Sequence, residues 1–117
     1  MTLDRAADDP SVAEARKWLR GNRNPSAFAS NRFATTANAL AFVDALYAAG
    51  AAKVMAENIN DTDGEGGAYA DSMLVYLPSD PAKRAAVFQV INEIGRPDTD
   101  GGPIMDNGSE TAGLWWD

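Results

Sequence analysis

Paired start and stop signals mark two helices, and these constrain the fold more than any other feature of the sequence. Thr36 can cap the first helix, and Gly50 can end it. Asp80 can cap the second helix, Pro81 suits its first position, and Gly95 can end it. The predicted helices are therefore 36–49 and 81–94.

The stretch between these two helices has the pattern of a β-hairpin. Residues 51–59 and 69–77 are the two strand candidates, and Pro78 stops the second. A polar, glycine-rich stretch joins them, as hairpin connections do. We therefore predict that 51–59 and 69–77 pair antiparallel.

An N-terminal helix and two outer strands complete the predicted pattern. Asp9 or Ser11 can cap a helix over 10–20, which Gly21 can end. A strand is expected in the ending "TAGLWWD", and a first strand at 26–33, although that stretch is also a plausible loop.

The predicted order of elements is α, then β-α-β-β-α-β. The second part is the ferredoxin-like split βαβ arrangement, so we predict an α+β fold with an extra N-terminal helix. In this fold a four-stranded antiparallel sheet carries the helices 36–49 and 81–94 on one face. Without a strand at 26–33, the core becomes a three-stranded α+β sheet.

The size of the chain fits one domain. Its 117 residues can bury a single core, with 1–22 as an N-terminal helical extension and 26–117 as the α+β core. No apolar run approaches the roughly 18 residues that span a bilayer. The lack of cysteine and of an apolar leader leads us to expect a cytoplasmic protein that does not contact membranes.

The absence of histidine and cysteine limits the chemistry. The chain cannot build the usual zinc site, a cysteine nucleophile or a Ser-His-Asp triad. We therefore expect no cofactor and no enzymatic activity. The remaining catalytic alternative is a carboxylate-based enzyme that uses Asp61, Asp63 or Asp71.

Alternating acids at Asp61, Asp63 and Glu65 raise the question of a calcium loop. Counted from Asp61, these residues and Gly66 match an EF-hand loop, but the twelfth position is Ser72, which cannot coordinate calcium bidentately. The flanks also look like strands. We therefore expect a polar turn and no metal, with a weak divalent site on these three acids as the alternative.

The charge of the chain is unevenly distributed. The net charge is −7; residues 1–35 hold six basic and four acidic residues, and residues 36–117 hold four basic and thirteen acidic ones. Such an acidic body repels nucleic acid and attracts basic protein surfaces. We therefore expect a protein partner and no nucleic acid.

One basic cluster lies in the predicted N-terminal helix. Arg16 and Arg20 are four residues apart, with Trp18 between them, and this composition is typical of protein interfaces. The alternative is that Trp18 packs into the body while the arginines are solvated or pair with nearby acids.

The adjacent Trp115 and Trp116 form the other candidate site. On a strand, one ring is buried and the other lies on the opposite face of the sheet. An exposed tryptophan on the face without helices, near Tyr76 or Met55, would mark a partner surface. Alternatively, the N-terminal helix covers that face.

These observations favour a small, acidic, non-catalytic protein-binding module. Its partner is expected to be another protein or a second copy of the chain in a homodimer. An inhibitor or immunity-type protein that covers a basic site is one form of this function. A weak divalent-cation-binding module is the alternative.

The ending "LWWD" follows a Gly/Asp-rich loop, and "ALAFVDALYAAGA" lies in the helix before the hairpin. In these features the chain resembles small uncharacterised bacterial α/β proteins. The resemblance covers residues 30–117 and implies no activity, cofactor or catalytic residue.

Overall fold

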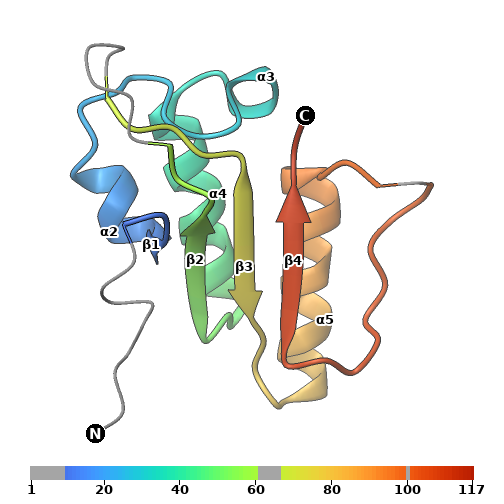
Figure 1. Cartoon of the computed structure of the whole chain (residues 1–117). Coiled ribbons are helices and arrows are strands. Elements are labelled where there is room, and N and C mark those ends of the chain that lie inside the picture. Colours follow the sequence, from blue (N-terminus) through green and yellow to red (C-terminus); the bar gives the residue numbers. More distant parts are fainter. Residues whose placement is uncertain (1–9, 61–66, 100) are drawn as a thin grey trace, which may run out of the picture.

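An antiparallel sheet with helices packed behind it forms the structure (Figure 1). It is a computed structural model that describes residues 10–60, 67–99 and 101–117. The elements, in chain order, are β1 (Ala13–Glu14), α2 (Ala15–Arg20), α3 (Ser30–Phe33), α4 (Thr36–Ala49), β2 (Lys53–Glu57), β3 (Ser72–Tyr76), α5 (Pro81–Val90), the π-helical turn η1 (Ile91–Gly95) and β4 (Thr111–Trp115).

The four strands lie side by side in sequence order, and all neighbours are antiparallel. In this register Val54 lies opposite Val75, and Met73 lies opposite Leu114. Both α4 and α5 lie behind the same face of the sheet (Figure 1). The side chains of the strands that are buried against these helices are Val54, Ala56, Met73, Val75, Ala112 and Leu114.

The two long helices begin and end at local signals in the sequence. The cap of α4 is Thr35 and not the predicted Thr36: the side chain of Thr35 accepts the N–H of Asn38, and the Thr36 hydroxyl instead accepts the N–H of Ala27. Gly50 ends the helix with φ 124°. The side chain of Asp80 accepts the N–H of Lys83 at 3.0 Å at the start of α5. The predicted helix at 36–49 is confirmed, and the predicted helix at 81–94 is present, with its last turn π-helical.

The predicted antiparallel pairing of 51–59 with 69–77 is confirmed by β2 and β3, and the predicted last strand by β4. The α+β class and the four-stranded antiparallel sheet with α4 and α5 on one face are also confirmed. The ferredoxin-like arrangement is not confirmed, because the fourth strand of the sheet is β1 and not the segment 26–33.

The prediction of a strand at 26–33 was wrong. Phe28 makes only an isolated bridge to Ala70, and α3 follows directly. A hydroxyl group from outside the segment takes one of the backbone groups that a strand would need, and a second hydroxyl bond fixes the turn that follows. The N–H of Ala27 donates to the Thr36 hydroxyl at 2.8 Å, and the Ser26 hydroxyl donates to the carbonyl of Ala34 at 2.8 Å.

The prediction that the first helix begins near residue 10 was also wrong. Ala13 and Glu14 form β1, which pairs with β2, and the helix α2 begins only at Ala15. The Glu14 side chain caps it by accepting the N–H of Lys17 at 2.7 Å, so Glu14 has the role predicted for Ser11 or Asp9. Asp9 lies outside the described residues.

Candidate protein-binding surface

The two adjacent tryptophans lie on opposite sides of the sheet. Trp116 is 2% exposed, and its ring packs against Phe28, Phe33 and Phe42 with centroid distances of 5.3, 5.4 and 5.8 Å. Its Nε1–H donates to the carbonyl of Gly95 at 2.7 Å. Trp116 is therefore a core residue and is not available to a partner, which corrects its place among the predicted partner-binding residues.

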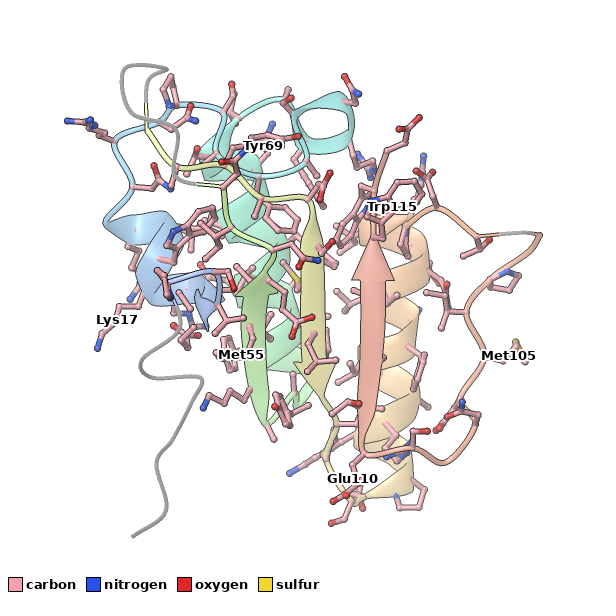
Figure 2. The ribbon with its side chains drawn as sticks, viewed as in Figure 1. Lys17, Met55, Tyr69, Met105, Glu110 and Trp115 are labelled. Carbon is pink, nitrogen blue, oxygen red and sulfur yellow. The ribbon has the colours of Figure 1, made fainter. Side chains whose placement is uncertain are left out.

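Trp115 lies on the face of the sheet that α4 and α5 leave uncovered (Figure 2). It is 50% exposed, and Tyr76 on the same face is 39% exposed. Leu74 lies opposite Gly113, which makes it a diagonal neighbour of Trp115. We call this surface the open face. By strand alternation it consists of Lys53, Glu57, Ser72, Leu74, Tyr76, Thr111, Gly113 and Trp115. Met55 lies on the same side of β2 but is buried opposite Glu14 of β1, so it is not part of the accessible surface.

The outer edge of β4 presents backbone groups to solvent. The N–H of Leu77 donates to the carbonyl of Glu110 at 2.8 Å. The N–H of Trp116 donates to the carbonyl of Asp71 at 3.1 Å. Along an antiparallel strand, the backbone N–H and C=O groups of successive residues point alternately toward one neighbouring strand and toward the opposite side. These two hydrogen bonds therefore determine, for each residue of β4, whether its N–H and C=O groups point toward β3 or away from it. The residues whose N–H and C=O groups point away from β3 are Thr111, Gly113 and Trp115.

One of these outward groups already has a partner. The N–H of Asp98 donates to the carbonyl of Trp115 at 2.9 Å, which confirms that this carbonyl points outward. Within the described residues, the outward N–H and C=O groups of Thr111 and Gly113 have no such partner. The β4 edge is therefore open over these two residues and closed at its end.

The outer side of β2 has backbone and side-chain partners. The N–H of Val54 donates to the Tyr47 hydroxyl at 3.0 Å, Ala56 pairs with β1, and the N–H of Ile59 donates to the carbonyl of Ser11 at 2.9 Å. The outer side of β2 is therefore occupied, with the two-residue strand β1 at that edge of the sheet, whereas the edge of β4 is open.

The predicted basic cluster in α2 is used within the chain. The Arg16 Nε–H donates to Asp44 at 2.7 Å, and its guanidinium lies 4.3 Å from the centre of the Tyr47 ring. Trp18 is half-buried and packs against the core, while Arg20 is exposed. This is the alternative in which the cluster serves packing, and α2 lies beside α4 rather than over the open face (Figure 1).

Glu14 and Tyr47 form a hydrogen bond beneath this helix. The Tyr47 hydroxyl donates to Glu14 Oε2 at 2.5 Å. Burial acts to raise the pKa of Glu14, but the bond from Tyr47 and the N–H groups of α2 hold that pKa below its ordinary value. Burial and the same bond raise the pKa of Tyr47. These groups hold α2 and the β2 edge together.

The acidic loops show no metal centre in the part of the chain that is described. Asp61, Asp63 and Glu65 lie outside it, and elsewhere no group of three or more potential metal ligands is present. In the second loop, Asp106 accepts two hydrogen bonds from Arg84. This contact, with the N–H of Gly108, lowers the pKa of Asp106 to about 2.

An open pocket of about 440 Å³ lies between α3, α4 and η1. The Arg32 Nε–H donates to the carbonyl of Gly95 at 3.1 Å, and the Asn38 amide donates to that of Phe33 at 2.8 Å. Arg32 and Asn38, two polar side chains that line the pocket, therefore form hydrogen bonds with backbone carbonyls. They do not converge on a position where a ligand could bind.

The sequence reasoning found Trp115 and Tyr76 but missed Thr111 and Gly113. A glycine between the buried Ala112 and Leu114 was the available signal, since glycine within a strand often marks close approach of another backbone. A Cβ at Gly113 would meet nothing within 4 Å.

No protein-family model, curated protein or solved structure matches this chain. Among the described residues, no helix has the length and apolar character needed to cross a membrane.

Proposed function

We propose that this chain is a small acidic protein-binding module without catalytic activity, and that its partner contacts the open face around Trp115. The half-exposed Trp115 on a sheet face that no helix covers is the observation that carries this proposal. Tryptophan and tyrosine are enriched in protein interfaces, where a large rigid ring gives much contact area for little loss of entropy.

The two carboxylates with shifted pKa values serve the fold rather than a reaction. Glu14 and Asp106 are carboxylates whose pKa departs from the ordinary value, and both pKa values are lowered by structural contacts. A carboxylic acid that transfers protons near neutral pH needs a raised pKa instead. A second copy of the chain is one candidate partner, and a basic site on another protein is the other.

Photo-crosslinking in the organism that encodes the protein tests this proposal. Trp115 is replaced by a photoreactive phenylalanine derivative; the matched control carries it at Met105, which is 74% exposed and lies away from the open face (Figure 2). We expect a discrete protein adduct from position 115 that position 105 does not give. Equal adducts at both positions, or none at 115, would refute the assignment of this face. An adduct of twice the monomer mass would identify the homodimer.

A further inference from the structure

The open edge of β4 is the feature that the proposed function does not yet use. We infer that an extended, basic segment of the partner adds to the sheet as a fifth strand beside β4, with its side chains reaching the open face. This deepens the proposed function and rests on it, because the same partner would contact Trp115.

The backbone groups of β4 provide the bonding pattern. Thr111 and Gly113 each present an outward N–H and an outward C=O, and an antiparallel strand can pair with all four of these groups. The bond from Asp98 to the carbonyl of Trp115 shows that this edge already accepts backbone bonding at its end. The added strand would extend from that point toward the start of β4.

The side chains of the open face provide selectivity. A residue opposite Gly113 would point its side chain to the open face, because paired residues share a face. There it would lie over a position that has no side chain and beside Trp115, and large apolar side chains cover strand glycines in this way. Alternate residues of the partner segment should therefore be large and apolar.

The charges around the edge favour a basic partner. Glu110 directly precedes β4, Asp117 is the second residue after it, and Asp98 lies beside its end; all three are exposed. Near the start of β4, Arg84 is paired with Asp106, and at its end Arg32 and Arg96 line one pocket with Asp98 and Asp117. The excess negative charge along the edge is therefore that of Glu110. An acidic edge attracts a segment that carries lysine or arginine and repels an acidic one.

The available space favours a single strand over a second folded copy. Three strands of five residues cover roughly 250 Å² at the usual strand spacing and rise, whereas a stable interface buries about 800 Å² on each side. Figure 1 also shows residues 101–110 passing along the outer side of β4. An added strand has to fit between this segment and β4, where it needs about 4.8 Å, whereas two copies meeting edge to edge would have to accommodate two such segments.

Three synthetic peptides test the inference. The first has seven residues in which lysine and valine alternate; the second carries glutamate in place of lysine; the third is the first with methylated valine nitrogens, which cannot donate. We expect the first peptide to bind and to shift the amide signals of Thr111 and Gly113 while slowing their hydrogen exchange. The other two should bind at least about tenfold more weakly.

Two variants at one position separate backbone bonding from surface contact. Gly113→Pro removes the outward N–H, which β3 does not use, so the sheet should persist while peptide affinity falls by about tenfold or more. Gly113→Ala keeps the N–H and should retain binding. Should Gly113→Pro fail to fold, the methylated peptide still tests the same bond.

Three results would overturn the inference. The first is that neither charged peptide binds at about 1 mM. The second is binding that resists Gly113→Pro and methylation but is lost in Trp115→Ala, which would leave the proposed function intact and remove the added strand. The third is protection of Thr111 and Gly113 that rises with protein concentration in the absence of peptide, which would make a second copy the occupant.

Discussion

Replacing Trp116 by alanine should be the most damaging change among the aromatic residues near the end of the chain. A buried tryptophan removes on the order of 200 Å² from water, which at about 25 cal/mol per Å² corresponds to roughly 5 kcal/mol. The retained β-carbon lowers this figure, and the cavity left among Phe28, Phe33 and Phe42 raises it. We expect a loss of about 4 kcal/mol in the free energy of unfolding, a large part of the 5–15 kcal/mol typical of a domain.

The neighbouring tryptophan provides the matched comparison. Trp115 is already half exposed, so Trp115→Ala should cost at most about 2 kcal/mol by the same arithmetic. Trp116→Phe keeps an aromatic ring and removes only the donor to Gly95, whose carbonyl retains the bond from Arg32; about 1 kcal/mol is expected beyond the lost area.

Urea unfolding followed by far-ultraviolet circular dichroism measures these differences, because tryptophan fluorescence itself changes between the variants. The denaturant dependence of the unfolding free energy should stay constant across the set. Equal losses for Trp115→Ala and Trp116→Ala would refute the assignment of one ring to the core and the other to the open face.

Two further predictions concern other parts of the fold. In Gly95→Ala, the new Cβ would lie 2.7 Å from Phe42 Cζ, so we expect the free energy of unfolding in urea to fall by about 1–2 kcal/mol. Gly113→Ala is the control, because its Cβ would meet nothing within 4 Å and should change the free energy little. Equal effects of the two changes would contradict the close packing of Gly95. The lowered pKa of Asp106, about 2 against an ordinary 3.8, means that its contact with Arg84 stabilises the fold fully above the ordinary value and is lost as pH falls through 2. Asp106→Asn should therefore be less stable than the parent at pH 6, and the two should converge near pH 2; a constant difference across this range would refute the contact.

Local signals in the sequence were sufficient for most of the fold. Gly50 and Pro81 have conformational preferences that depend on their own backbone, so α4 and the start of α5 could be placed without knowledge of the rest. The hairpin of β2 and β3 likewise depends on neighbouring stretches of the chain.

The errors arose where distant groups compete for the backbone. The sequence of 26–33 has the pattern of a strand. In the structure, however, the N–H of Ala27 donates to the hydroxyl of Thr36, which lies nine residues further along the chain. In the same way, β1 forms by pairing with backbone groups on the outer side of β2, which lies about 40 residues away in the sequence. This pairing places Glu14 where its side chain caps α2. Neither contact has a signature in the local sequence.

The candidate surface was only half predictable for a related reason. Alternation along a strand requires that one of Trp115 and Trp116 be buried, but which one depends on the side where α4 and α5 pack. The open edge at Gly113 depends on the strand order, which is a property of the whole sheet.

The unequal edges of the sheet limit how copies of this protein can assemble. A sheet with two free edges can grow without end, as each added molecule presents a new edge to the next. Here the Tyr47 hydroxyl and β1 occupy the outer side of β2, so the edge on that side is the two-residue strand β1, while the other edge is the five-residue strand β4. If two copies meet through the β4 edge of each, the contact closes on itself as a pair and leaves the β4 edge of neither molecule free for a third.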